Sequence, residues 1–379
     1  MRSFNWNEVC EHRLAHSYLA KPAEAHAIPK VTSAVCGVQA QILSAAGLAL
    51  SARVQPITQQ DVNTELWERR RIVKTIGPRE TLHLLPASEL SLWMAAMCAR
   101  HALNEAYWYE KEDLEPAQAD ALLAAIGETL DGRCLTREQL SDEASLRAGS
   151  WALEKLNSPW GNLLGPAAFN GLLCFGPPQG ARATFVRADQ WIGNGWTQVD
   201  PSQALKEICR RYFAAYGPTR YQGFGHWFGL KPADARQIVE SLGEELEEVN
   251  FEGRPAWILA GEEVLTQGQD ISSLHLLPQY DCYILGCGER ERIVPDFSRR
   301  RVSVHGRGRF EGATGLPVLL VDGVVAGIWD RKAHGKRIDL RVEPFIDITA
   351  DQRSQLEAEA QRVGTFFEGE VSLSIEALD

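Results

Sequence analysis

The sequence has 379 residues, of which 45% are hydrophobic and 23% are charged, and its formal net charge is −11. This composition is typical of a globular, soluble protein and excludes an intrinsically disordered or membrane-embedded chain. No apolar run approaches the roughly 20 residues of a membrane-spanning helix, and the N-terminal stretch carries acids and histidines where a signal peptide is apolar. We therefore expect a cytoplasmic protein with no membrane partner, built from two or three domains or from several small modules.

The charges are distributed unevenly along this acidic chain. Residues 104–147 contain eleven acids and four bases, whereas residues 69–79 contain five bases and no acid. Residues 290–309 contain seven arginines and two acids. Such a distribution produces either one basic face, which would suit a nucleic acid, or a solvated surface of ion pairs. The net charge itself argues against a protein that binds nucleic acid over its whole surface.

The cysteines and histidines show no metal-binding pattern. The eight cysteines form no CxxC pair, and Cys282 and Cys287 have no second pair at zinc-finger spacing. The nine histidines form no HExxH motif or similar cluster. We expect buried, reduced thiols, no metal and no other cofactor.

The first part of the chain has the pattern of successive helices. Residues 5–19 have apolar side chains at helical spacing, and residues 30–36 predict a short helix that ends at Gly37, a residue suited to left-handed backbone. A further helix is predicted after Ser44, a potential N-cap, and another opens at Thr58.

Two short strands are predicted next, at 70–76 and 80–85. Helices followed by a β-hairpin make a winged-helix arrangement, in which the hairpin lies near a phosphate backbone. The later predicted elements are helices at 88–103, 115–130 and 136–140, a strand at 184–187, helices at 202–217, 220–230 and 231–243, and a strand pair at 246–259. This recurrence predicts tandem repetition of one module.

From about residue 270 the pattern is that of a β-region. Residues 317–330 predict two strands around the turn Asp322-Gly323, and residues 336–345 predict another strand. An amphipathic helix at 350–367 is predicted to close the chain.

A pair of glutamines, Gln39 and Gln41, flanks one small apolar residue directly after a glycine. Residues two apart point in nearly opposite directions on a helix but in the same direction on an extended segment. Because a glycine ends one helix and Ser44 can begin the next, we expect an extended segment with both amides on one side. Val38 and Ala40 would then pack on the other side. The alternative is that the amides bond backbone groups at a helix–helix turn.

Several further motifs occur in a characteristic order. They are "TLHLL" at 81–85, "RRYFAAYGPTR" at 210–220, "HWFGL" at 226–230, "LLPQYDCYILG" at 276–286 and "VDGVVAGIWDR" at 321–331. Together with the glutamine pair, they resemble the AlkZ/YcaQ superfamily of bacterial winged-helix DNA glycosylases, over about residues 8–365.

The resemblance implies an α+β fold that is C-shaped around DNA. Three tandem winged-helix modules and a C-terminal β-region are expected. Their boundaries would be 1–105 for module 1 with the glutamine pair, 106–200 for module 2, 201–268 for module 3, and 269–379 for the β-region and closing helix.

The resemblance also implies the activity. The AlkZ-like branch carries glutamine, an apolar residue and glutamine as its catalytic motif, whereas the YcaQ-like branch has aspartate in the last place, so Gln39 and Gln41 are the expected catalytic residues. The implied enzyme is a monofunctional DNA glycosylase for cationic N-alkylpurine adducts in double-stranded DNA. Bulky natural-product adducts or interstrand crosslinks are the expected lesions, and self-resistance the expected role. No heptad pattern suggests a dimer helix, so we expect a monomer.

Contacts to DNA are expected from the basic segments. The candidates are Lys74, Arg79 and His83 on the first wing and Arg299, Arg300, Arg301, Arg307 and Arg309 near the C-terminal β-region. Since His83 alternates with two leucines, we expect it to face away from the packed side, toward DNA or solvent. Trp227 and Trp329 are expected in the core, with aromatic wedges into DNA as the alternative.

Two positions depart from the superfamily pattern. Glu80 stands on the first wing where glycine is usual, and a carboxylate there would repel a phosphate. Gly223 stands before the tryptophan motif where aspartate is usual. The departures point to a changed lesion pocket or a changed contact to DNA.

Two other functions remain open at this point. A non-catalytic winged-helix transcriptional regulator would need a recognition helix with base-reading side chains, usually in a dimer, and would leave the glutamine pair without a role. A protein that binds and sequesters adducts is the third candidate.

Overall fold

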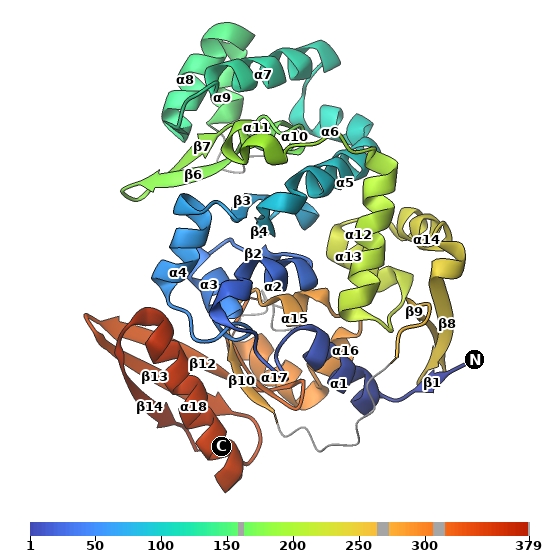
Figure 1. Ribbon diagram of the computed structural model, residues 1–379, viewed down its shortest axis with the longest axis vertical. Helices are drawn as coiled ribbons and strands as arrows, with labels where there is room; N and C mark the ends of the chain where they lie inside the picture. Colours follow the sequence, from blue (N-terminus) through green and yellow to red (C-terminus); the bar gives the residue numbers. More distant parts are fainter. Residues whose placement is uncertain (158–162, 264–272, 306–314, 378–379) are drawn as a thin grey trace. The chain divides into compact units, whose positions relative to one another are not determined.

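The computed structural model describes residues 1–157, 163–263, 273–305 and 315–377. The chain folds into two compact units (Figure 1): unit 1 is formed by Met1–Asn63 and Cys209–Asp379, and unit 2 by the intervening Thr64–Ile208. Both units mix helices with strands, which confirms the predicted α+β class. The number and boundaries of winged-helix modules stay a prediction. Within the described ranges, no helix combines the length and apolar character needed to cross a bilayer.

Unit 1 begins with a short strand and a series of helices. Its elements are β1 (Ser3–Phe4), α1 (Trp6–His16), the 3-10 turn η1 (Ala25–Ala27), α2 (Ile28–Ala34), β2 (Val38–Gln39), α3 (Leu43–Ser51) and α4 (Gln59–Asn63). Asn5 and Glu8 form a capping box that starts α1, with hydrogen bonds of 3.0 and 2.8 Å. Thr58 caps α4 as predicted. The predicted cap Ser44 is wrong, because α3 begins at Leu43 with Ile42 at the cap position, two residues earlier than predicted, and has no side-chain cap.

The second segment of unit 1 opens with helices and a strand pair. The elements are α12 (Pro201–Tyr216, whose first residues belong to unit 2), α13 (Tyr221–Phe228), α14 (Pro232–Glu240), the 3-10 turn η6 (Gly243–Glu245), β8 (Leu246–Phe251) and β9 (Arg254–Leu259). β8 and β9 are the antiparallel pair predicted at 246–259. β1 runs parallel to β8, with Ser3 opposite Asn250, so the N-terminal residues are fixed in this sheet.

The rest of unit 1 contains a five-stranded sheet. The elements are β10 (Leu274–Leu277), α15 (Cys282–Gly286), α16 (Arg290–Ile293), α17 (Asp296–His305), β11 (Val318–Val321), β12 (Val324–His334), β13 (Arg337–Pro344), α18 (Ala350–Phe367) and β14 (Glu370–Ile375). The strands follow one another in chain order; only the last pair, β13 and β14, is parallel. Figure 1 shows α18 lying along this sheet, in red. The predicted closing helix is present but does not close the chain, because β14 follows it.

The turn between β11 and β12 brings the two segments of unit 1 together. Asp322 and Gly323 have φ of 50° and 75°, as the predicted tight turn requires. A Cβ on Gly323 would lie 2.0 Å from the Cys10 sulfur and 2.7 Å from the Tyr283 hydroxyl. α1 therefore packs directly on this turn, and its residues share one apolar core with β10, α15 and β11.

Unit 2 contains two antiparallel strand groups and most of the remaining helices. Its elements are the π-turn η2 (Thr64–Glu68), β3 (Ile72–Ile76), η3 (Pro78–Glu80), β4 (Leu82–Pro86), η4 (Ala87–Glu89), α5 (Leu90–Ala102), α6 (Glu105–Glu112), α7 (Pro116–Thr129), β5 (Leu135–Thr136), α8 (Arg137–Ala148), α9 (Trp151–Leu156), α10 (Leu164–Phe169), β6 (Cys174–Gln179), β7 (Arg182–Val186), α11 (Ala188–Trp191) and η5 (Gly193–Gly195). The predicted hairpin is confirmed, since β3 and β4 pair with Thr75 opposite His83. The predicted capping box of Thr136 and Gln139 starts α8, and the strand predicted at 184–187 is part of β7.

The cysteines are largely inside the protein. All eight are reduced, and six of them are buried; Cys98 is half-buried and Cys134 is exposed. Burial raises the pKa of the Cys174 and Cys282 thiols, the latter to about 12. These buried thiols are protonated and inert at neutral pH, in agreement with the expected structural role.

Candidate active site

The glutamine pair begins on a short extended segment, as predicted for Gln39, whereas Gln41 follows the strand at a bend. Two residues with positive φ, Cys36 at 56° and Gly37 at 86°, reverse the chain after α2. The strand β2 then covers Val38–Gln39, and Val38 and Ala40 are fully buried. The alternation therefore places the two small apolar side chains in the core, as the extended arrangement requires.

The two glutamines differ in exposure. Gln39 is 7% exposed, whereas Gln41 is exposed to solvent. The next residue, Ile42, is 41% exposed, which is unusual for a large apolar side chain. The segment thus runs from the protein interior to the surface within four residues.

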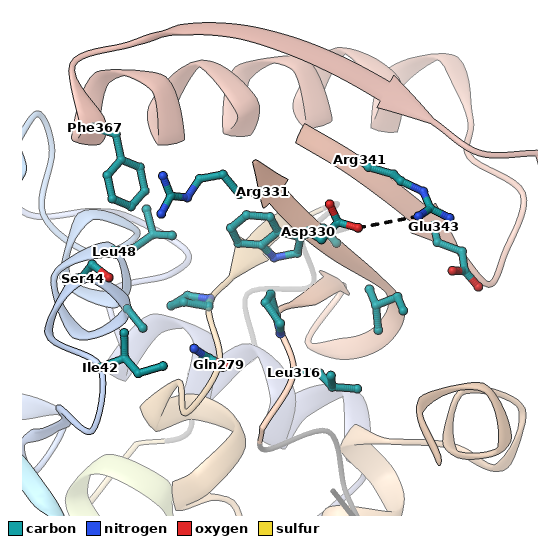
Figure 2. A pocket seen from close by; sticks show the side chains of 15 residues that line it. Ile42, Ser44, Leu48, Gln279, Leu316, Asp330, Arg331, Arg341, Glu343 and Phe367 are labelled. Carbon is teal, nitrogen blue, oxygen red and sulfur yellow. Dashed lines mark ion pairs between the residues drawn. The ribbon is translucent and has the colours of Figure 1, made fainter. Parts of the chain in front are cut away.

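A pocket of about 450 Å³ begins directly after Gln41. Figure 2 shows Ile42, Ser44 and Leu48 on one side, contributed by the start of α3, and Gln279, Arg331 and Phe367 among the residues on the other sides. All of the lining residues belong to unit 1. This pocket has the size of a ligand site and combines apolar walls with a few polar groups.

The polar groups of the pocket are held by specific contacts. The Arg331 guanidinium lies over the Phe367 ring, 3.8 Å from its centroid, and burial lowers the pKa of Arg331. Asp330 lies 3.8 Å from Arg341, as the dashed line in Figure 2 marks, and Arg341 also pairs with Glu376 at 2.6 Å. One wall therefore presents a stacked, partly desolvated cation.

The segment that carries the glutamines is supported by a buried network. The Tyr216 hydroxyl donates to the backbone carbonyl of Val35 at 2.8 Å, just before the chain reversal. At the far end of α3, Arg53 forms a bidentate ion pair with Asp281, at 2.7 and 2.8 Å, and both side chains are fully buried. Tyr216 and Asp281 thus fix the backbone on either side of the glutamines. Each of the two residues lies in one of the motifs that carry the family resemblance.

α18 adds a second support at the end of α3. Arg362 donates to the Ser51 hydroxyl at 2.7 Å and to the backbone carbonyl of Leu276 at 2.9 Å. Its charge is neutralised by Glu359 at 2.7 Å. The helix that follows the glutamine pair is therefore anchored by two buried arginines.

The predicted DNA contact at His83 does not have the expected orientation. His83 is only 3% exposed, so the prediction that it faces away from the packed side is wrong. Burial, together with the neighbouring Arg79 charge, lowers the pKa of His83 to about 3. β4 is buried on both faces, so alternation with leucines does not bring this ring to the surface.

The other predicted bases of the first wing are engaged within unit 2. Lys74 lies over the Phe175 ring at 5.1 Å, and burial lowers the pKa of its ammonium. Arg79 is half-buried, with φ of 56°. Arg71 and Arg69 pair with Glu65, so the basic run is partly neutralised by an acid that precedes it.

The described members of the predicted C-terminal arginine set lie on a helix, α17, whose Ser298 hydroxyl donates to the Val325 carbonyl of β12, so they are near the C-terminal β-region as predicted. Arg299, Arg300 and Arg301 belong to α17. Arg299 lies 3.4 Å from Asp296, Arg300 is exposed, and Arg301 lies over the Phe345 ring at 5.5 Å. Arg307 and Arg309 lie outside the described residues.

The two departures from the superfamily pattern have structural explanations. Glu80 forms an ion pair with Arg100 at 2.7 Å, so its charge is compensated. A Cβ at position 223 would lie 2.7 Å from the Tyr212 hydroxyl and 2.8 Å from the Thr219 hydroxyl. Glycine is therefore required by close packing, and an aspartate would not fit without rearrangement.

The sequence could have indicated some of the supporting residues. Arg53 and Asp281 are single charges within apolar stretches, and a lone charge in such a stretch is typical of a buried, paired group. Trp227 and Trp329 are 4% and 5% exposed, which confirms that they belong to the core. Gln279 and Arg331 lie within two of the motifs that carry the family resemblance, but nothing in their residue type marked them as lining a pocket.

Comparisons with known proteins agree with this arrangement. The model of the family described as DNA glycosylase AlkZ-like matches residues 32–366. The chain is 31% identical, over 95% of both sequences, to an interstrand DNA cross-link repair glycosylase of Streptomyces sahachiroi. Its fold is similar to the solved structure of Streptomyces sahachiroi DNA glycosylase AlkZ, with a TM-score of 0.83, 29% identity, and coverage of 99% of this chain and 100% of the other. The chain therefore belongs to the family of AlkZ-like DNA glycosylases.

Proposed function

We propose that this DNA glycosylase hydrolyses the N-glycosidic bond of cationic N-alkylpurine adducts in double-stranded DNA, with Gln39 and Gln41 as its catalytic residues. The observation that carries the proposal is the strand Val38–Gln39 after the double left-handed turn, which leaves Val38 and Ala40 fully buried and brings Gln41, two residues after Gln39, to the surface. Side chains two residues apart on such a segment return to the same side. Both amides would then face one reacting water.

The chemistry suits neutral amides. A purine alkylated at N7 or N3 already carries a positive charge, so the base leaves as a neutral molecule when the C1′–N bond breaks. The sugar becomes oxocarbenium-like and forms a new bond from C1′ to a water oxygen, and the water's surplus proton passes to solvent. A glutamine carbonyl accepts a hydrogen bond from that water, and its dipole stabilises the positive charge that develops on the sugar. Fixing the water below C1′ adds the advantage of proximity.

The same reasoning defines which lesions are excluded. An amide is neither an acid nor a base near neutral pH, so it cannot protonate a poor leaving group. A neutral lesion such as uracil needs that assistance. We therefore propose that this enzyme releases cationic adducts and leaves neutral lesions in place.

The pocket beside Gln41 suits a substrate larger than a methylated base. It offers about 450 Å³ next to the proposed catalytic segment, which is enough for the bulky part of a natural-product adduct. The relative from Streptomyces sahachiroi is named for interstrand cross-link repair. We accordingly propose bulky adducts or interstrand crosslinks as lesions, self-resistance as the role and a monomer as the active form.

We propose that the exposed and half-exposed basic side chains bind the DNA backbone. Arg299 and Arg300 on α17 are exposed, and Lys74 and Arg79 on the first wing are half-buried. Each phosphate neutralised by such a group releases counterions and steepens the salt dependence of binding. His83 is left out of this set because its ring is buried.

The test uses three duplexes, which carry N7-methylguanine, an interstrand crosslink through N7 of guanine, or uracil. Single-turnover excision is followed by alkaline cleavage of the abasic product. The wild type should act on the first two duplexes and spare the third. Gln39→Ala and Gln41→Ala should lose about a hundredfold or more in rate, whereas Gln60→Ala, an exposed glutamine on α4, should leave it unchanged.

The outcomes separate the alternatives. If the wild type leaves both alkylated duplexes intact and instead protects one specific sequence, a winged-helix regulator is the better description. Tight binding to the adduct without an abasic product indicates sequestration. Full activity of both glutamine variants would refute the catalytic assignment alone.

A further inference from the structure

Unit 1 contains a cluster of side chains that could hold a metal ion. These residues have no part in the proposed glycosylase chemistry. The cluster consists of His12 and His16 on α1 and Glu262 in the segment after β9. One ligand atom from each of the three lies within 4.8 Å of the other two. His12 and His16 are one helical turn apart, and their ring centroids are separated by 4.1 Å. Two histidines at this spacing on one helix face are a recurrent metal-binding arrangement.

The buried histidine has no other partner among the described residues. His12 is 1% exposed, and neither of its ring nitrogens has a hydrogen-bond partner within the described ranges. The ring is enclosed by the protein, and a neutral imidazole in this position keeps a lone pair for coordination. A buried polar group without a partner is unfavourable, and a bound ion would satisfy it.

The donor atoms of His16 and Glu262 are already separated by the distance expected between two ligands of one ion. The His16 Nε2 and a Glu262 carboxylate oxygen lie 3.3 Å apart, and both side chains are about a quarter exposed, at 29% and 27%. Two ligands bound at about 2.0–2.1 Å to a tetrahedral ion are separated by about 3.3 Å. The pair thus requires little movement to share one ion.

Hydrogen bonds to its backbone carbonyl and amide hold Glu262 in place. Arg2 donates to the Glu262 carbonyl at 2.7 Å and pairs with Glu247 on β8 through bonds of 2.9 and 2.7 Å. The Glu262 amide also bonds the end of β9, at the Leu259 carbonyl, at 3.1 Å. These contacts fix the carboxylate beside α1 independently of any ion.

We propose that His12, His16 and Glu262 form a binding site for one divalent transition-metal ion of the Zn²⁺ class. Two imidazoles and one carboxylate are typical ligands for such an ion, whereas Mg²⁺ and Ca²⁺ prefer oxygen ligands alone. Water reaches the partly exposed side and completes the coordination.

The proposed ion is structural. It lies away from the glutamine pair in sequence and connects α1 to the segment after β9. α1 also supplies Arg13, which pairs with Glu289 at 2.7 Å, so the ion would hold a helix that is central to the core of unit 1. No step of the glycosylase reaction passes through it.

The test uses the full-length protein, purified without a histidine tag and stripped with a chelator. Co²⁺ is titrated while the visible d–d absorption is recorded, and Zn²⁺ binding is measured by equilibrium dialysis. The wild type should bind one equivalent of either ion. His16→Ala and Glu262→Gln, both at partly exposed positions, should weaken binding at least about tenfold.

A matched control is available at another histidine. His26 also lies near a carboxylate, with its Nδ1 3.5 Å from Glu24, but the side chains are 79% and 86% exposed and offer no third ligand. His26→Ala should bind metal like the wild type, and Zn²⁺ should raise the melting temperature of wild type and His26→Ala but not of His16→Ala. Absence of stoichiometric Co²⁺ or Zn²⁺ binding by the wild type would overturn the proposal, as would unchanged affinity in both ligand variants.

Discussion

The buried pair of Arg53 and Asp281 should be essential for the stability of unit 1. Both side chains are 0% exposed and are joined by two hydrogen bonds of 2.7 and 2.8 Å. Asp281→Asn removes the negative charge and turns an amide NH₂ toward the guanidinium. An uncompensated charge in a buried position costs about 3–5 kcal/mol of unfolding free energy.

The assay is urea-induced unfolding followed by tryptophan fluorescence, with Asp339→Asn as the matched control. Asp339 pairs with Arg337 at 2.9 Å, but the two side chains are 38% and 67% exposed, so screening limits the control's loss to less than about 1 kcal/mol. The double variant Arg53→Met/Asp281→Leu removes both charges and should regain most of the stability, apart from about 1 kcal/mol for the lost N-cap of α15.

Two results would refute this reasoning. The first is a loss for Asp281→Asn no larger than that of Asp339→Asn. The second is a double variant whose loss equals the sum of the losses measured for Arg53→Met and Asp281→Leu separately, since a buried pair must show strong coupling between its members. In either case the pair would not be what holds α3 behind the glutamine segment.

Three other predictions follow from single positions. Because the folded-state pKa of His83 is about 3 against 6.5 for the free side chain, the unfolded chain binds the proton first, so His83 should contribute a loss of stability of about 2 kcal/mol between pH 7.5 and pH 5. In urea titrations at both pH values, His83→Gln should reduce the pH dependence by this amount and leave the contribution of His12, whose pKa is also lowered to about 3. Gly223→Ala should destabilise unit 1 by about 1–3 kcal/mol through overpacking, whereas Gly195→Ala, where the new Cβ meets no atom closer than 3.6 Å, should be neutral in thermal unfolding. Arg300→Ala should lower the slope of log affinity against log salt for an undamaged duplex by about one, and Arg300→Lys should preserve it; an unchanged slope in the alanine variant would remove Arg300 from the proposed contact set.

Local signals in the sequence predicted local structure well. The end of α2 near Gly37, the cap at Thr58 and the turn at Asp322 were predicted because each depends on one residue's backbone preference or side-chain cap. The extended glutamine segment was predicted from the same kind of signal. A backbone feature that one residue determines can be inferred without knowing its neighbours in space.

Features that depend on distant neighbours were missed. The burial of His83 was not predictable, because alternation shows on which side of a strand a residue lies but not whether that side is covered. The strand β14 was missed because its pairing partner β13 precedes an entire helix. The histidines at 12 and 16, four residues apart on a predicted helix, were visible in the sequence but were not singled out, and the third member of the cluster, Glu262, could not be inferred because it comes from a distant part of the chain.

The division of unit 1 into two sequence segments has a consequence for the order of events during biosynthesis. Arg53 emerges from the ribosome 228 residues before Asp281, which at about 5–20 residues per second is a delay on the order of 10 to 50 s. Until then the helix behind the glutamine pair carries an unpaired cation, while unit 2, a continuous segment, is already complete. The glutamine segment thus acquires its buried support late in synthesis, so a chain truncated before α15 would retain the glutamines without the contacts that position them.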